Sequence, residues 1–352
     1  MRTEALPDQP PAALSGGPEP GLAVGEIRTG LLRNSRTLPH GAVAELLNLL
    51  PGEPVRRSER PIAHALSPDV VNGVDCQIAT KSGGRMRAVG TILTHAVIVG
   101  GRVLQTSSYT TIASHGSQRR LPWSHYTARP GRIETIARAG LADLAAGYLA
   151  LDQEPGCLDL GSVSERLARR LQSSAVLDGH QPLRFQWTRL RWAARYGLDD
   201  DTAEPSAQFE LVDDTVRALS LRIPRPPATP SGAVDLGAIL ELCRDLALHD
   251  WVLTTLTRRI ERADPGSGDR RRTAAELGPA IDHLLPLWMP GARVADELSA
   301  VWEGFERRPG FTRQWEAAVS RVRDQLALHT LQLLANLSSP DTSGEIGSKI
   351  EF

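Results

Sequence analysis

The sequence predicts an α+β protein: a mostly antiparallel β-sheet domain with packed helices at the amino terminus, followed by a carboxy-terminal all-α helical bundle domain. Runs rich in Val, Ile and Thr, separated by glycine turns, occur before residue 223. Helical periodicity dominates after residue 233. A proline-rich stretch at 224–232 separates the two regions and is typical of a stiff linker. We therefore expect an α+β domain over 21–223 and a helical domain over 233–337.

Composition limits the classes of function. The chain has 352 residues, is 41% apolar and carries a formal charge of −1, which is typical of a folded protein without a strong global field. This charge argues against nucleic acid as a partner. Residues 1–20 are predicted to form a disordered leader and 338–352 a flexible tail. Since there is neither a signal-like segment nor a long apolar window, we expect a cytoplasmic protein without a membrane partner.

The elements of the first domain follow from local patterns. The segment 23–32 reads as a strand, and 42–50 as a helix that ends before Pro51-Gly52. Segments 76–80, 85–99 and 102–113 predict an antiparallel meander. Helices are expected over 133–150 and 162–171, the second with a capping box from Ser162 to Glu165. Alternation predicts a strand over 183–196, and Asp213-Asp214 joins a predicted hairpin of 207–212 and 215–223.

The second domain is predicted to contain four helices, at 234–262, 273–286, 294–307 and 311–337. The first and the last have long apolar stripes, each with one histidine on it, His249 and His329. Similar words, RDLALH at 244–249 and RDQLALH at 323–329, precede these histidines. Both imidazoles are therefore expected to face a helical core.

Three stretches resemble an uncharacterised family of conserved actinobacterial, streptomycete-type proteins: GEIRTGLLRNS at 25–35, LLPLWMPGAR at 284–293 and RRPGFTRQW at 307–315. The resemblance covers nearly the whole chain after the leader. Members of that family tend to be encoded beside a variant P-loop protein and a methyltransferase-like protein. The resemblance implies no activity, but it does imply one component of a multi-protein system.

A metal site is one hypothesis for the helical region. His249-Asp250 and Asp282-His283 are similar to the His-Asp doublets of helical metal-dependent phosphohydrolases, and His329 could complete the set. However, Asp282 and His283 lie off the apolar stripe of their helix. The competing interpretation makes His249 and His329 core histidines with hydrogen-bond partners, and we expect no metal and no cofactor.

A second candidate site is the loop that follows the meander. Its arginines could bind phosphate or carboxylate, and its aromatic rings could stack on a base. The alternatives are a contact with a partner protein or a solvated surface loop. Its candidate residues are His115, Arg119, Arg120, Trp123, His125, Tyr126 and Arg129.

Three hypotheses for function follow. The favoured one is a non-catalytic interaction or assembly component that binds itself or another protein. It rests on the lack of a complete catalytic motif and on the four tryptophans of the helical region, Trp251, Trp288, Trp302 and Trp315, which are expected to reach the surface. The alternatives are a phosphohydrolase-like enzyme that uses His249, Asp250 and His329, and a nucleotide or nucleic-acid binder that uses the 115–129 loop.

Overall fold

The computed structural model describes residues 21–114, 119–150, 155–198, 204–225, 235–263 and 270–338. The predicted leader, most of the predicted linker and nearly all of the predicted tail lie outside these ranges.

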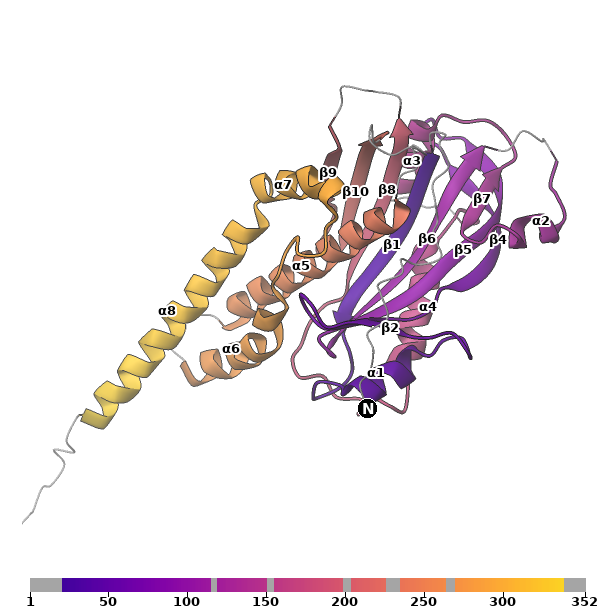
Figure 1. Ribbon diagram of the computed structural model, residues 1–352. Coiled ribbons are helices and arrows are strands. Elements are labelled where there is room, and N and C mark those ends of the chain that lie inside the picture. The colour runs from indigo at the N-terminus through magenta and orange to yellow at the C-terminus, as the bar shows by residue number, and fades with distance from the viewer. Residues whose placement is uncertain are drawn as a thin grey trace, which may run out of the picture.

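All ten strands of the described ranges belong to one mixed sheet (Figure 1). The strands are β1 (Gly21–Leu31), β2 (Arg56–Ser58), β3 (His64–Leu66), β4 (Val70–Ala79), β5 (Arg85–Val99), β6 (Val103–Ser114), β7 (Arg132–Thr135), β8 (Thr188–Leu198), β9 (Ser206–Leu211) and β10 (Val216–Pro224). Their order is β2-β3-β5-β7-β6-β1-β8-β10-β9; β4 also pairs with β5, and β5 pairs directly with β6. The β8–β10 and β6–β7 pairings are parallel, and the others are antiparallel.

The helices lie on both faces of this sheet. They are α1 (His40–Leu47), α2 (Trp123–Thr127), α3 (Leu141–Leu149), α4 (Leu160–Gln172), α5 (Leu236–Ala263), α6 (Arg270–Leu284), α7 (Ser299–Arg307) and α8 (Phe311–Ser338), with 3-10 turns η1 (Leu285–Leu287) and η2 (Asp296–Leu298). Helices α3 and α4 pack on one face, and α5 crosses the other (Figure 1). The mixed α+β class is therefore confirmed.

The central strand β1 shows why both faces need cover. Leu22 and Val24 belong to the apolar cluster under α3, whereas Ile27 belongs to the cluster that contains α5. Successive side chains of a strand point to opposite faces, so this alternation buries β1 on both sides. Opposite Gly25 lies Trp192 of β8, and a Cβ on residue 25 would come within 2.5 Å of the indole ring. Glycine is therefore required there to leave room for the ring.

The expectation of a separate helical bundle is not confirmed. Helix α5 contacts β1 and β8 directly. Its buried residues, such as Leu246 and Trp251, belong to the same apolar cluster as Ile27 of β1, and that cluster continues into α6, α7 and α8. An apolar stripe shows that a helix buries one face, but it does not identify the partner. Here α5 packs on the sheet as well as on α6 and α8.

Several boundaries differ from the sequence predictions. The helix predicted over 133–150 is strand β7 followed by α3, with Gly140 as the N-cap residue of α3. The predicted capping box is also wrong: Asp159 is the N-cap residue of α4, and its side chain accepts a hydrogen bond from the Ser162 backbone N–H at 3.0 Å. The β5–β6 and β9–β10 hairpins are confirmed. At the turn between β5 and β6, Gly100 and Gly101 both have positive φ values.

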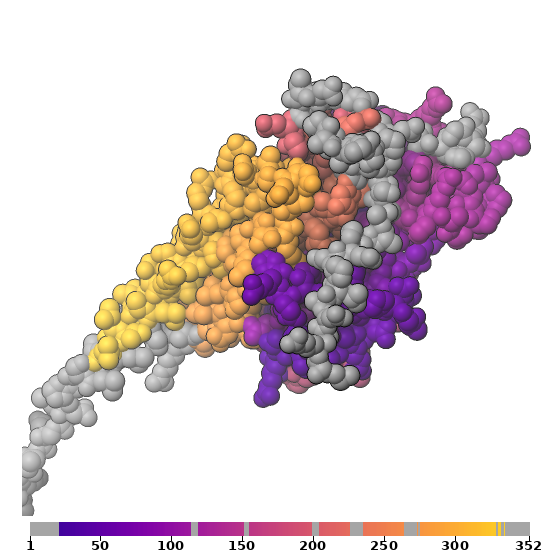
Figure 2. All heavy atoms as spheres, in the orientation of Figure 1, coloured from indigo at the N-terminus to yellow at the C-terminus, as the bar shows by residue number. Residues whose placement is uncertain are grey.

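Helix α8 extends away from the rest of the molecule (Figures 1 and 2). Its first turns are anchored by buried Phe311 and Trp315, whereas the side chains described beyond Leu326 are exposed. None of the helices in the described part of the chain has the length and apolar composition that a bilayer span requires.

Candidate functional site

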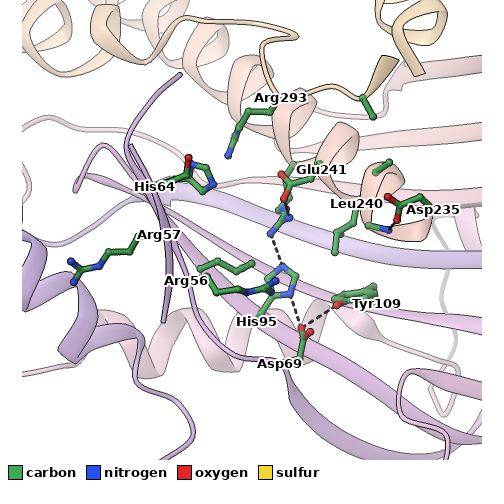
Figure 3. Close-up of a pocket in the computed structure, with 16 residues that line it drawn as sticks. Arg56, Arg57, His64, Asp69, His95, Tyr109, Asp235, Leu240, Glu241 and Arg293 are labelled. Atoms are coloured by element: carbon green, nitrogen blue, oxygen red, sulfur yellow. Dashed lines mark hydrogen bonds and ion pairs between the residues drawn. The ribbon is translucent and has the colours of Figure 1, made fainter. Parts of the chain in front are cut away.

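A pocket of about 310 Å³ lies where the short strands β2 and β3 meet the first turns of α5 (Figure 3). Polar side chains from separate segments line it: Arg56 from β2, His64 from β3, Glu241 and Arg244 from α5, and Arg293 from the segment between η1 and η2. Residues far apart in sequence therefore share one polar cavity between the sheet and the helices.

His95 of β5 is the centre of a hydrogen-bonded chain at the pocket wall. Its side chain is buried, with Nδ1 2.9 Å from Asp69 Oδ1 and Nε2 3.3 Å from Arg244 Nη1 (Figure 3). Because a guanidinium only donates, Nε2 accepts from Arg244, and Nδ1 donates its proton to Asp69. Tyr109 Oη donates to the same Asp69 oxygen at 3.0 Å.

The charge states follow from burial and from these bonds. Burial lowers the pKa of His95 below its usual 6.5, although the Asp69 hydrogen bond acts the other way. Burial acts to raise the pKa of Asp69, but the hydrogen bonds from His95 and Tyr109 lower it below its usual value. Burial also raises the pKa of Tyr109 well above 10. At neutral pH this hydrogen-bonded group thus contains the neutral imidazole of His95, the carboxylate of Asp69 and the neutral phenol of Tyr109.

Arg244 is held in place from several sides. One guanidinium nitrogen donates to His95, another forms an ion pair with Glu241, and Gln105 Nε2 donates to the Arg244 carbonyl oxygen at 3.0 Å. The Arg244 side chain is only 4% exposed. Within the described residues, its Nε and the Oε2 atom of Glu241 are buried without a hydrogen-bond partner. Buried polar atoms ordinarily have partners, so these two atoms each lack a partner in side chains that line the pocket.

Three further arginines border the same cavity: Arg56, Arg57 and Arg293. In Figure 3 the Arg56 side chain points toward His95, and Arg293 extends from the helical side. Arg293 lies 3.5 Å from Asp245 Oδ1. No hydrogen bond or ion pair joins the Arg56 guanidinium to any residue in the described ranges. Arg244 is therefore fixed by hydrogen bonds, whereas the charge of Arg56 acts on Asp69 without a hydrogen bond between them.

This arrangement favours binding over proton transfer. The hydrogen bond between Asp69 and His95 is similar to that of the Asp–His pair in a catalytic triad. The partner of His95 Nε2 here is Arg244, however, and not a nucleophile. The lone pair on His95 Nε2 already accepts the Arg244 N–H. The pair therefore orients an arginine, and arginine forks recognise carboxylate and phosphate groups.

Sequence reasoning missed this pocket. The one local signal was His95, a polar residue within the apolar run Ile92–Val99. Its partners, Asp69 and Arg244, are 26 and 149 residues away in the chain, so no motif of fixed spacing connects them.

The sequence-predicted metal residues do not form one cluster. His249 Nδ1 donates to the Asp245 carbonyl oxygen at 2.7 Å, and Nε2 accepts from the Met289 backbone N–H at 3.2 Å. The lone pair that would coordinate a metal is thus already used. Asp250 instead pairs with Arg217 at 2.8 Å. Within the described ranges, no three His, Cys, Asp or Glu side chains lie close enough to hold a metal ion.

The other members of that predicted set lie elsewhere. Asp282 and His283 are on α6, exposed and half-buried respectively. His329 is on α8, about four turns beyond Trp315, the residue through which α8 joins the tryptophan cluster around His249. The His329 side chain lies outside the described part of the structure.

The predicted loop is folded back onto the sheet by acidic residues. His125 Nε2 lies 3.0 Å and Arg129 Nη1 3.1 Å from carboxylate oxygens of Glu134 on β7. Arg120 lies 3.4 Å from Asp75 and stacks over the Trp123 ring at 5.3 Å.

Of the other residues of that loop, Arg119 is exposed, and Tyr126 is buried and accepts a hydrogen bond from the Leu121 N–H. His115 lies outside the described residues. Several of the loop's cationic groups thus already have carboxylate partners, which lowers their availability to a phosphate.

No known family, curated protein or solved structure matches this chain. The proposed function therefore rests on the geometry of the chain's own residues.

Proposed function

We propose that this chain is a non-catalytic assembly component that associates through the projecting end of α8, with a second copy of itself as the partner that this surface fits best. The single observation that carries the proposal is the exposure of large apolar side chains there. Leu328, Leu331 and Leu334 are 49%, 62% and 55% exposed. Apolar groups concentrated on a projecting helix are typical of an interaction site.

The composition of the helix end supports this role. Residues 325–338 contain six leucines and no Asp, Glu, Lys or Arg. At 1.5 Å per residue this segment is about 21 Å long. A helix that is apolar on more than one side gains little from packing on a single surface, and it is stabilised by cover on several sides.

The same composition favours self-association over a charged partner. A surface without charges offers nothing that selects a partner of opposite charge. A second copy presents the same leucines, and two such helices can pack around a two-fold axis without repulsion between like charges. The multi-protein system that the family resemblance implies remains compatible with a further protein on the outside of such a dimer.

The tryptophans that first suggested a docking surface do not supply it. Trp251, Trp302 and Trp315 are buried in the core, and Trp288 is half-buried. The expectation that these four rings reach the surface is therefore wrong for Trp251, Trp302 and Trp315. They are core residues because α5 packs on the sheet and needs cover from α7 and α8 on its other side.

Light scattering coupled to size-exclusion chromatography tests the proposal on the full chain. We expect a dimer that dissociates on dilution, and a monomer for Leu331→Glu at the same concentration. The matched control is Leu211→Glu, since Leu211 is equally exposed at 62% but lies on the edge strand β9. A monomeric parent chain at all concentrations, or dissociation by Leu211→Glu alone, would contradict the role of α8.

A further inference from the structure

We propose that the pocket between β2, β3 and the start of α5 binds a small molecule through its phosphate or carboxylate group, with Arg56 and Arg244 as the binding cations. This inference does not depend on the α8 interface. It assigns a ligand site to a cavity of about 310 Å³, which is within the size range of small-molecule sites.

The carboxylates at the pocket already have hydrogen-bond or ion-pair partners. Asp69 accepts from His95 and Tyr109, Glu241 pairs with Arg244, and Asp235 caps α5 by accepting from the Gly237 N–H at 2.8 Å. Each carboxylate at the pocket therefore has a donor. Donor capacity remains on Arg244 Nε, which is buried without a partner among the described residues. It also remains on Arg56, whose guanidinium forms no hydrogen bond or ion pair within the described ranges. An anionic group is the ligand that completes this set.

The Arg244 side chain is held in one orientation before a ligand binds. Arg244 is nearly fully buried, and its orientation is fixed by His95 on β5 and by Glu241 one helical turn earlier. A guanidinium that is already held in place loses little conformational freedom when a ligand binds. The first turn of the 28-residue helix α5 also borders the cavity, and the partial positive charge of a helix N-terminus favours an anion there.

A buried acceptor at the pocket indicates which further group the ligand carries. Glu241 Oε2 is a buried acceptor with no partner among the described residues. A bound molecule that places a hydroxyl or amino donor next to the anionic group would satisfy this atom. The site therefore favours hydroxylated anions, such as sugar phosphates or hydroxy acids, over a simple ion.

Isothermal titration calorimetry on the full chain tests this site. The probes are inorganic phosphate, ribose 5-phosphate and citrate, with neutral ribose as the uncharged control. We expect ribose 5-phosphate or citrate to bind more tightly than inorganic phosphate, and ribose not to bind. Preference for ribose 5-phosphate would assign a phosphate site, and preference for citrate a carboxylate site. Equal binding of ribose, or no binding of any anion, would overturn the proposal.

A matched pair of variants assigns the cation. Arg56→Gln should weaken binding by at least about tenfold, since it removes a charged fork donor. Arg36→Gln is the control, because Arg36 is exposed and does not line the pocket, whereas Arg57 borders the same cavity as Arg56. Arg56→Lys keeps the charge and should give an intermediate affinity, so the site stays testable if the Gln variant folds poorly. Equal losses for Arg56→Gln and Arg36→Gln would show a general charge effect and reject the site.

The monomeric variant Leu331→Glu separates this proposal from the assembly role. It should bind the anion as the parent chain does, because α8 does not line the pocket. Loss of binding in that variant would show that the pocket depends on association, and it would reject the pocket as an independent site.

Discussion

The rings of Trp288 and Trp315 are stacked face to face, with centroids 4.3 Å apart and planes 6° apart. This contact joins the segment that follows η1 to the second turn of α8. His249 packs edge-to-face on Trp288, with ring centroids 5.2 Å apart. Thus α5, the η1–η2 segment and the base of α8 are held together at one aromatic cluster.

Replacement of Trp315 by Ala should destabilise the chain by about 3–5 kcal/mol, because it removes a buried aromatic ring and leaves a cavity. Trp315→Phe keeps part of the stack and should cost less. Urea unfolding measures both changes. Trp123→Ala is the control, since that ring is 41% exposed and its loss should cost much less. Similar losses for Trp123→Ala and Trp315→Ala would show that stacking does not anchor α8.

Buried charge at the centre of the sheet gives a second prediction. Glu26 is 1% exposed and accepts from Arg189 Nε at 2.7 Å, with Arg191 3.6 Å away. Glu26→Gln should cost about 3–5 kcal/mol, since half-buried Arg189 and buried Arg191 would lose their carboxylate. Glu165→Gln is the matched control. Its carboxylate is one third exposed and pairs with Arg28 at 2.7 Å, so its loss should cost about 1 kcal/mol or less. The comparison fails if the two variants have equal midpoints of denaturation.

Acid should loosen the segment that His249 holds. Burial lowers the pKa of His249 below 6.5, while the charge of Asp245 acts in the opposite direction and that of Arg293 in the same direction. Because the unfolded state takes up this proton more readily, stability is fully present above pH 6.5. It declines as the pH falls from there toward the folded-state pKa, by about 1.4 kcal/mol for each unit of pKa difference.

Unfolding free energies measured between pH 8 and pH 5 check this sign. The decline should be smaller in His249→Gln than in the parent chain, because Gln cannot be protonated there. His40→Gln provides the control, since it removes a histidine whose side chain is largely exposed. An identical slope for the parent chain and His249→Gln would remove His249 from the explanation.

Two of the three cysteine thiols, those of Cys76 and Cys243, should react slowly in the folded chain. Burial, with the nearby charge of Asp75, raises the pKa of Cys76 to about 12. Burial also raises the pKa of Cys243 far above its usual value. Thiolate is the reactive form, so at pH 8 these two thiols should remain unmodified by a disulfide reagent until denaturant is added. Rapid reaction of three thiols in the native chain would contradict this burial.

The parts of the fold that could be predicted are those encoded locally. The β5–β6 hairpin follows from two adjacent glycines, and α5 and α8 follow from long apolar stripes. What could not be predicted depends on partners distant in sequence. The stripe of α5 indicates burial, but only the fold shows that β1 and β8 provide the cover. Likewise, β2 and β3 have three residues each, too few for a strand pattern, yet they place Arg56 and His64 at the pocket.

The position of β1 has a consequence for synthesis on the ribosome. This strand is made among the first residues of the described chain, but its neighbour β8 begins only at Thr188 and its cover α5 at Leu236. Until those segments emerge, Ile27 and Leu31 have no place to be buried. The side of β1 that β8 and α5 cover is therefore buried only late in synthesis. A nascent chain halted before α5 would present this apolar surface to chaperones.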